Sequence, residues 1–246
     1  MKITTVTVCY NVRATIGRTV QSFLAQTHPD KELLVIDGGS TDGTVEAIQS
    51  FQSGAIRIIS EPDSGIYDAM NKGLALFSGE AVGFLNADDV YHDVLVLTRI
   101  AQALESADAV YGDLKMVADQ TSKKTVREWQ AGAFVPGSFR DGWMPPHPTF
   151  YLRRELVEKT GPFDLTYRIS ADYDFMLRAL ELHNPRVRHI PHTLVDFTIG
   201  GVSTKNPMAV ILGNLECLRA RRRHLQAPFI DVALFAKPLR KLRQLS

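Results

Sequence analysis

The stretch Leu33-Leu34-Val35-Ile36-Asp37-Gly38-Gly39-Ser40-Thr41-Asp42-Gly43-Thr44 decides the fold class of this 246-residue chain. Its first four residues are all apolar, which predicts a short strand buried on both faces, as strands of a parallel sheet are. The glycines and small polar residues that follow predict a tight turn. Apolar residues at helical spacing over 45–51 then predict a helix that begins at this turn.

The same alternation of strand and helix continues on both sides of this stretch. Short apolar or Val-, Ile- and Thr-rich runs predict four further strands: Ile3–Cys9, 56–59, 81–85 and 109–111. Apolar residues at helical spacing predict four more helices: 14–26, 66–77, 94–104 and 171–182. A hairpin is expected between 114–117 and 125–129. The order of these elements predicts an α/β fold with a mainly parallel sheet flanked by helices.

The charge of the chain is distributed unevenly along its length. The formal net charge is +1, so the chain as a whole gives no reason to expect a nucleic-acid partner. Residues 216–246 nevertheless carry eight Lys or Arg and two acids, a net of +6, which leaves the rest at −5. We therefore expect one domain over 1–205 and a basic amphipathic helical tail over 206–246. The tail either contacts an anionic membrane surface or packs on the domain with a solvated basic face.

The cysteines and the hydropathy indicate where in the cell the chain is located. Two cysteines, Cys9 and Cys217, lie far apart in the sequence, which favours reduced thiols and a cytosolic chain over a disulfide framework. We expect no signal peptide, because the first strand-like run follows Met1-Lys2 at once and soon meets Tyr10, Asn11 and Arg13. We expect no transmembrane helix, because no apolar stretch reaches about 18 residues. The predicted location is the cytoplasm, at the inner face of the cell membrane if the tail binds lipid.

Acidic residues follow two of the predicted strands. Asp37 ends the strand over 33–36, and Asp88 and Asp89 follow the strand over 81–85. Ligands of such sheets bind at the carboxyl ends of the strands. Two adjacent carboxylates repel each other unless a cation offsets their charge, and Mg²⁺ or Mn²⁺ prefers oxygen ligands. The alternative is that Asp37 stabilises the turn after it and that the other two cap a helix.

The chain lacks the sequence patterns that usually bind phosphate groups. Neither G-x-x-x-x-G-K-[ST] nor G-x-G-x-x-G after a strand is present. A diphosphate held by a metal ion and acids suits a substrate in which the diphosphate is the leaving group.

Several segments, in this order along the chain, resemble glycosyltransferase family 2. The resemblance covers roughly residues 3–201, and its segments are 8–11 (VCYN), 26–29 (QTHP), 35–44 (VIDGGSTDGT), 60–73 (SEPDSGIYDAMNKG), 86–89 (NADD) and 170–174 (SADYD). Three positions depart from the family pattern: Val8 and Cys9 replace the usual Pro-Thr, and Ala171 replaces the Glu of the last motif.

The resemblance implies a GT-A fold and a nucleotide-sugar donor whose anomeric carbon is inverted. It implies that Tyr10 stacks on the nucleotide base and that Asp37 hydrogen-bonds the base. Asp88 is expected at the ribose or the metal, and Asp89 is expected to be the main metal ligand. Asp172 is expected to take the proton from the acceptor hydroxyl as general base. Asp172 could instead be only the N-cap of the helix that it precedes.

Three further residues are candidates for substrate contacts. Asp68 lies in the matching segment 60–73, and we expect it at the donor. Trp143 and His147 lie in a Pro-rich loop, where they either contact the acceptor or pack within the loop.

The expected function is transfer of a sugar from a nucleotide-diphospho-sugar to a hydroxyl of a sugar or a lipid-linked acceptor, with Mn²⁺ or Mg²⁺ as cofactor, in polysaccharide or glycolipid biosynthesis. A non-catalytic nucleotide-sugar sensor on the same fold is the alternative, although a sensor would need no base at Asp172. A nucleotidyltransferase would need a glycine-rich loop with Arg or Lys after the first strand, and Arg13 alone does not supply it.

Overall fold

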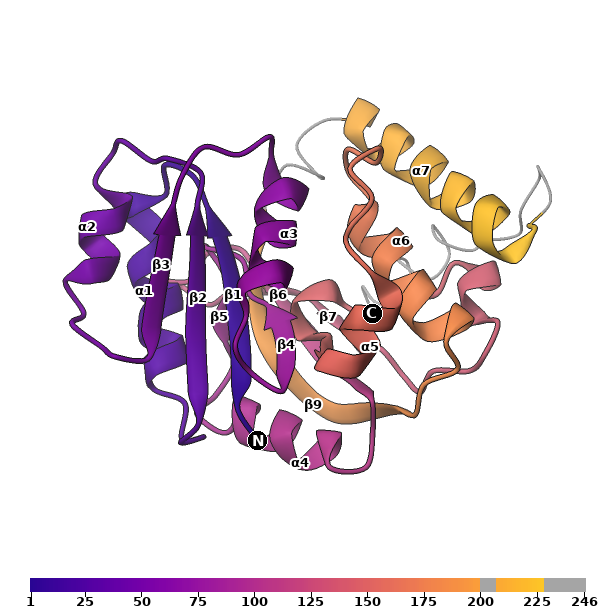
Figure 1. The fold of residues 1–246 in the computed structure, drawn as a ribbon, viewed down its shortest axis with the longest axis horizontal. Helices are drawn as coiled ribbons and strands as arrows, with labels where there is room; N and C mark the ends of the chain where they lie inside the picture. Colours follow the sequence, from indigo (N-terminus) through magenta and orange to yellow (C-terminus); the bar gives the residue numbers. More distant parts are fainter. Residues whose placement is uncertain (200–206, 228–246) are drawn as a thin grey trace.

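The computed structural model describes residues 1–199 and 207–227. Within them, nine strands form one sheet in the order β3-β2-β1-β4-β8-β6-β9-β5, with β7 paired to β6 (Figure 1). The strands are β1 (Ile3–Cys9), β2 (Lys31–Asp37), β3 (Ile56–Ser60), β4 (Ala81–Phe84), β5 (Val90–Tyr91), β6 (Ala109–Val117), β7 (Thr125–Trp129), β8 (Tyr151–Arg153) and β9 (Val187–Thr198).

The central part of the sheet is parallel, as expected. β1 lies between β2 and β4 and runs parallel to both, and β2 runs parallel to β3. Residues 33–36 alternate between the two faces of the sheet: Leu33 and Val35 join one hydrophobic cluster, whereas Leu34 and Ile36 join the other. Because both faces are covered, each apolar residue of this run is fully buried.

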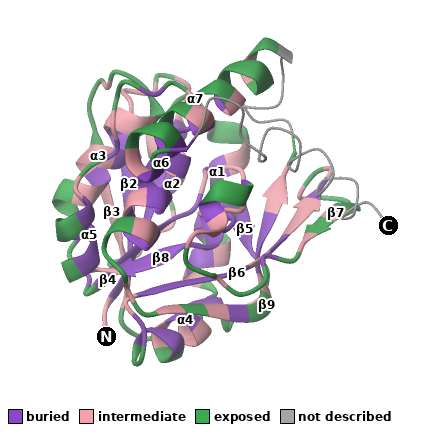
Figure 2. Cartoon of the chain, turned by 90° about the vertical axis from the view of Figure 1, so that its right-hand side faces the viewer, coloured by how far each residue is buried: buried purple, intermediate pink, exposed green. Residues whose placement is uncertain are grey.

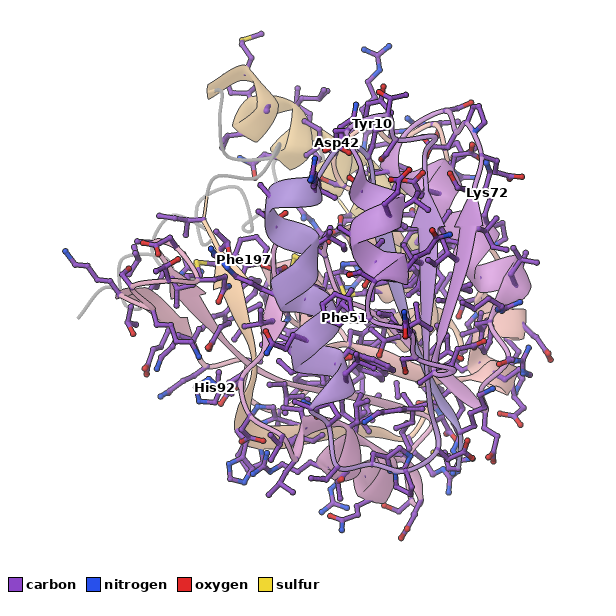
Figure 3. The ribbon with its side chains drawn as sticks, turned by 90° about the vertical axis from the view of Figure 1, so that its left-hand side faces the viewer. Tyr10, Asp42, Phe51, Lys72, His92 and Phe197 are labelled. Atoms are coloured by element: carbon purple, nitrogen blue, oxygen red, sulfur yellow. The ribbon has the colours of Figure 1, made fainter. Side chains whose placement is uncertain are left out.

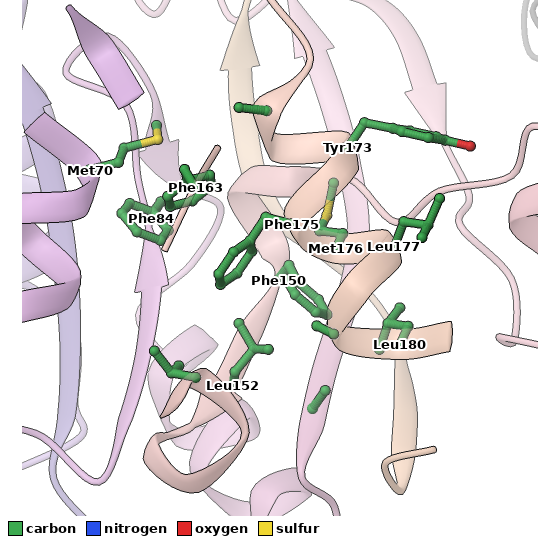
Figure 4. Close-up of a cluster of buried hydrophobic side chains, with 14 of the residues drawn as sticks. Met70, Phe84, Phe150, Leu152, Phe163, Tyr173, Phe175, Met176, Leu177 and Leu180 are labelled. Atoms are coloured by element: carbon green, nitrogen blue, oxygen red, sulfur yellow. The ribbon is translucent and has the colours of Figure 1, made fainter. Parts of the chain in front are cut away.

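Helices cover both faces of the sheet. α1, α2 and α4 contribute to the cluster that holds Leu33, and α3, α5, α6 and α7 contribute to the cluster that holds Leu34. Aromatic side chains from both halves of the chain fill the second cluster (Figure 4). The helices are α1 (Arg13–Leu24), α2 (Thr44–Gln49), α3 (Ile66–Leu76), α4 (Val96–Leu104), α5 (Arg154–Thr160), α6 (Ala171–Leu177) and α7 (Pro207–Leu225), with short 3-10 turns at Ser138–Asp141 and His147–Thr149.

The second half of the sheet departs from the predicted pattern. The predicted strand 109–111 is the start of the longer strand β6, which continues into the predicted hairpin with β7. β8 and β9 were not predicted, and β8 pairs antiparallel with both β4 and β6. The helix predicted over 171–182 ends at Leu177 as an α-helix and continues as a π-helix over Arg178–Leu182.

The C-terminal helix is part of the packed structure. α7 packs against α6, while residues 228–246 of the predicted tail lie outside the described residues. The division of the chain at residue 205 stays a prediction. Figure 2 shows that α7 also keeps an exposed face. None of the described helices is both long enough and apolar enough to cross a membrane. Both cysteines are buried.

One close contact joins β4 to its antiparallel neighbour β8. A Cβ atom on Gly83 would lie 2.5 Å from the ring of Tyr151. That tyrosine is fully buried, and its hydroxyl lies 2.5 Å from the hydroxyl of Tyr91, which lies 2.6 Å from Thr5 Oγ1. The ring therefore cannot move aside without disturbing a buried hydroxyl network.

We predict that Gly83→Ala destabilises the protein by about 1–3 kcal/mol, the usual cost of overpacking a core. The free energy of unfolding in urea measures this. Gly17→Ala is the matched control, because a Cβ there meets nothing within 4 Å and alanine favours the helix. Equal stabilities for the two variants would contradict the prediction.

Candidate active site

The carboxyl ends of three parallel strands meet at one edge of the sheet. Cys9 pairs with Asp37 and Asp37 with Ser60, so the residues that follow β1, β2 and β3 lie side by side. Tyr10 directly follows β1 and is 63% exposed. Figure 3 shows it at the same edge as Asp42. An exposed aromatic ring at this edge can stack on a planar base, as expected for Tyr10.

Asp37 is fully buried at the end of β2, and its carboxylate holds the turn that follows. The backbone N–H groups of Gly39 and Ser40 donate to Oδ2 over 3.1 and 2.9 Å, and Ser60 Oγ donates to the same oxygen over 2.7 Å. Ser40 Oγ and Cys9 Sγ donate to Oδ1. Both oxygens therefore accept hydrogen bonds that hold the turn, which matches the alternative that Asp37 stabilises the turn after it. The contact of Asp37 with a base stays a prediction.

A second acid lies over the same turn. A Cβ atom on Gly38 would lie 2.5 Å from Asp63 Oδ2 and 3.4 Å from Tyr10 Cδ2. Only glycine allows the Asp63 carboxylate to approach the backbone this closely. The half-buried Asp63 is thus a carboxylate next to the Tyr10 ring, and its other oxygen accepts the N–H of Gly65 over 2.8 Å.

The two acids after β4 differ in their surroundings. Asp89 is fully buried, and its carboxylate accepts the Thr198 N–H over 2.9 Å and the Asn86 amide over 2.7 Å. Asp88 is half-buried. Its backbone carbonyl accepts Thr198 Oγ1 over 2.7 Å, and Thr19 Oγ1 donates to the carbonyl of Asp89 over 2.8 Å. The side chain of Asp89 therefore faces the protein, and Asp88 is the more accessible carboxylate, while the expected role of Asp89 as main metal ligand stays a prediction.

The charge at this pair suits a cation. Burial, and after it the charge of Asp88, raises the pKa of Asp89 well above its ordinary value. Among the described residues, no group of three or more His, Cys, Asp or Glu could hold a metal ion by itself. Mg²⁺ commonly binds one or two carboxylates and completes its shell with water and substrate phosphates. The residues present fit a cation shared with a diphosphate.

Asp172 lies in the first turn of α6 and is half-buried. The Tyr67 hydroxyl, on α3, donates to the carbonyl of Ile169 and lies 3.4 Å from Asp172 Oδ1. Burial, and then the charge of Asp172, raises the pKa of Tyr67, so this hydroxyl keeps its proton at neutral pH. Tyr67 was part of the matching segment 60–73, yet only the structure brings it to Asp172.

His147 lies near Asp172. Its ring stacks on Phe84 at the end of β4, with centroids 5.5 Å apart, and meets the edge of Phe163. Burial lowers the pKa of His147, although the charge of Asp172 opposes the shift. Its Nε2 atom is buried and has no hydrogen-bond partner among the described residues. An acceptor contact of His147 stays a prediction.

Trp143 has a different environment. Its indole N–H donates to the carbonyl of Ala131 over 2.8 Å, and its ring packs against Tyr111, Phe134 and Phe139. These contacts match the loop-packing alternative, and an acceptor contact of Trp143 stays a prediction.

Helix α3 connects the two halves of the site. Asp68 Oδ2 accepts the N–H of Ser64 over 2.9 Å and so holds the start of this helix. One turn later, the Asn71 amide donates to the Phe163 carbonyl over 3.0 Å and accepts the Phe163 N–H over 2.8 Å. Asn71 thereby clamps the segment before α6 to α3. A donor contact of Asp68 stays a prediction.

The model of the family described as Glycosyl transferase family 2 matches residues 4–168. The chain belongs to this family. A PGL/p-HBAD biosynthesis glycosyltransferase of Mycobacterium bovis BCG is 36% identical over 174 residues, which are 68% of this chain and 65% of that protein. This chain thus spans slightly less than two thirds of that relative. An uncharacterized glycosyltransferase of Mycobacterium tuberculosis is 30% identical over 237 residues, 92% of this chain and 86% of that protein.

Solved structures of glycosyltransferases have the same fold as this family-2 chain. Staphylococcus aureus TarS 1–349 superposes with a TM-score of 0.69 at 18% identity, over 95% of this chain and 68% of that one. The mannosyltransferase PcManGT of Pyrobaculum calidifontis, solved with GDP-Man and Mn²⁺, superposes with a TM-score of 0.67 at 18% identity, over 96% of this chain and 68% of that one. The expected GT-A fold is confirmed.

We predict that Asp37→Asn destabilises the protein by about 1–3 kcal/mol at pH 7, because an amide cannot accept all the hydrogen bonds of the turn. Burial opposes ionisation of Asp37, but the hydrogen bonds from Ser40, Ser60 and Cys9 outweigh it and hold its pKa below the ordinary value of 3.8. A lowered pKa stabilises the folded state above the unfolded pKa and loses this effect as the pH falls.

The difference between wild type and Asp37→Asn should therefore shrink below about pH 4. Urea unfolding at pH 3.5 and 7 measures it, with the exposed Glu128→Gln as control. A difference that is the same at both pH values would contradict the assigned role.

Proposed function

We propose that this chain is an inverting glycosyltransferase that moves a sugar from a nucleotide-diphospho-sugar to an acceptor hydroxyl. The observation that carries the proposal is the arrangement around α3. This helix packs on β1 and β2, which lead to Tyr10 and Asp37 at an edge suited to a nucleotide diphosphate, and its Tyr67 reaches Asp172, a half-buried carboxylate suited to a base. Family membership supports the same reaction.

Asp88, the more accessible carboxylate of the pair, is proposed to bind a divalent metal ion. Asp89 has no exposed surface, and both of its oxygens accept hydrogen bonds from the protein. Its role in this proposal is to hold the loop so that Asp88 faces the diphosphate. A bound Mn²⁺ or Mg²⁺ would offset the negative charge that develops on the leaving nucleoside diphosphate.

In the proposed mechanism, Asp172 accepts the proton of the acceptor hydroxyl. The hydroxyl oxygen forms a bond to the anomeric carbon while the bond from that carbon to the diphosphate oxygen breaks. Attack from the face opposite the leaving group inverts the anomeric carbon, and the nucleoside diphosphate leaves with the electron pair. Tyr67, which keeps its proton, holds the Asp172 carboxylate, and His147 is proposed to lie next to the acceptor.

The chemistry of the relatives supports the substrate classes. TarS has been solved with UDP and UDP-GlcNAc, and PcManGT with GDP-Man, so a nucleotide-sugar donor is proposed here as well. The relative named for PGL/p-HBAD biosynthesis supports a polysaccharide or glycolipid acceptor. The proposed location is the cytoplasm at the inner face of the cell membrane.

The first test is a donor screen. We predict that the purified chain releases nucleoside diphosphate from one of UDP-GlcNAc, UDP-glucose, GDP-mannose and dTDP-glucose, that Mn²⁺ or Mg²⁺ is required, and that EDTA stops the release. Asp172→Asn should lower the rate by about 10²–10⁴-fold with little change in donor KM, as expected for loss of a general base.

Asp88→Asn should raise the Mn²⁺ concentration needed for half-maximal rate at least tenfold. Its control is Asp93→Asn, a substitution in the next loop, where the acid pairs with Arg99. Tight donor binding without release by the wild type, even with acceptor sugars present, would favour the sensor alternative. Neither binding nor release would contradict the donor site.

Contact with a membrane surface is a second part of the proposal. The exposed side of α7 carries Met208, Ile211 and Leu215, which are 68%, 54% and 55% exposed and lie at helical spacing. Arg219 continues the same stripe one turn later and is exposed. Apolar side chains next to basic ones favour an interface with anionic lipid headgroups.

We predict that the chain co-sediments with vesicles containing phosphatidylglycerol, and less with pure phosphatidylcholine, and that 0.5 M salt weakens the binding. Ile211→Asp with Leu215→Asp should lower the bound fraction at least fivefold. Val135→Asp, at a 61% exposed position outside α7, is the control. Unchanged binding of the double variant would rule out this face.

A further inference from the structure

The single acidic residue of α7 lies among basic ones and faces the protein interior. α7 contains Glu216 followed by four arginines within seven residues. Glu216 is nevertheless only 7% exposed. A buried carboxylate is costly unless hydrogen bonds compensate for its lost hydration, so its partners indicate its role.

The partners of Glu216 are three successive backbone N–H groups. Oε1 accepts the N–H of Arg168 over 2.8 Å, and Oε2 accepts the N–H groups of Ile169 and Ser170, each over 2.9 Å. Ser170 Oγ also donates to the carbonyl of Gly213 on α7 over 3.0 Å. Charge-assisted hydrogen bonds to consecutive amides hold a segment in one conformation.

The segment held in this way leads directly into the proposed base. Residues 168–170 directly precede α6, and Asp172 is the second residue of that helix. From the opposite side, the Tyr67 hydroxyl donates to the carbonyl of Ile169 and lies 3.4 Å from Asp172 Oδ1. The backbone of Ile169 is thus held from two sides: its N–H donates to α7, and its carbonyl accepts from α3.

α7 also holds the next turn of α6. Asp174 is 1% exposed, and its carboxylate accepts from Arg178 Nε over 2.8 Å and lies 2.9 Å from Nε2 of His224, which is on α7. Arg221, also on α7 and 1% exposed, donates to the Tyr173 hydroxyl over 3.1 Å. Both sides of Asp172 along the chain are therefore attached to α7.

We propose that Glu216 is a positioning residue, which fixes the 168–170 segment so that the Asp172 carboxylate meets the acceptor hydroxyl in a reactive orientation. The inference rests on the proposed function, because it takes Asp172 as the base. It assigns to α7 a role in the reaction itself, in addition to any contact with a membrane. Glu216 touches neither the donor edge at Tyr10 nor Asp172 directly.

The test measures kcat and donor KM of the full chain with whichever of UDP-GlcNAc, UDP-glucose, GDP-mannose and dTDP-glucose is turned over. Glu216→Gln should lower kcat at least tenfold and leave donor KM within twofold. Because Glu216 acts through Asp172, the double variant with Asp172→Asn should be no slower than Asp172→Asn alone. Hydrogen exchange of the amides of 168–170 should become faster in the free Glu216→Gln protein.

Two further variants keep the test independent of gross unfolding. Gly213→Ala favours the helix, yet its Cβ would lie 3.2 Å from Ile169 Cγ2, so it should displace the same segment and lower kcat by a smaller factor. Arg223→Gln breaks a different contact of α7, the 2.7 Å ion pair with Asp164, and should leave kcat within twofold.

A kcat of Glu216→Gln within twofold of wild type would overturn the positioning role. The role would also be overturned if the losses of kcat in Glu216→Gln and Asp172→Asn multiply in the double variant, or if donor KM rises by as much as kcat falls. If Asp172→Asn lowers turnover but Glu216→Gln does not, only this inference fails. If Asp172→Asn leaves turnover unchanged, the base assignment fails and the positioning role falls with it.

Discussion

The buried carboxylate of Asp37 is the interaction on which the edge of the sheet with Tyr10 depends. A charge at the end of a fully buried strand is tolerated only because five donors, two from the backbone and three from side chains, surround it. Those same hydrogen bonds determine the path of the turn after β2 and tie it to β1 and β3. The positions of Tyr10 and Asp63 at the surface follow from this arrangement.

Helices α3 and α7 perform a corresponding task in the second half of the site. α3 holds the segment before α6 through Asn71 and Tyr67, and α7 holds it through Glu216. Neither helix belongs to that segment, so the conformation around Asp172 is determined by contacts over long sequence separations. A site built from two halves of a sheet needs such connections, because a catalytic carboxylate is useful only when its distance from the donor is constant.

Neighbouring acids in this chain have unlike surroundings because their burial differs. Asp88 and Asp89 are adjacent in sequence, yet one is half-buried and the other has no exposed surface. A carboxylate whose oxygens are both hydrogen-bonded by the protein stabilises a loop, whereas a partly exposed one can meet a cation. Asp172 and Asp174 show the same contrast, since Asp174 is enclosed by Arg178 and His224.

The sequence by itself determined the strands and helices of the first half of the chain, because apolar runs and helical spacing report burial directly. It also determined the family and the edge of the sheet at which the acids collect. Only the tertiary structure decided which acid faces solvent, that β9 pairs with β6, and that Tyr67 and Glu216 meet at residues 168–170. The physical reason is that side-chain direction and long-range pairing depend on packing between distant segments, on which local patterns carry no information. A lone acid among the arginines of α7 was the one local signal for Glu216.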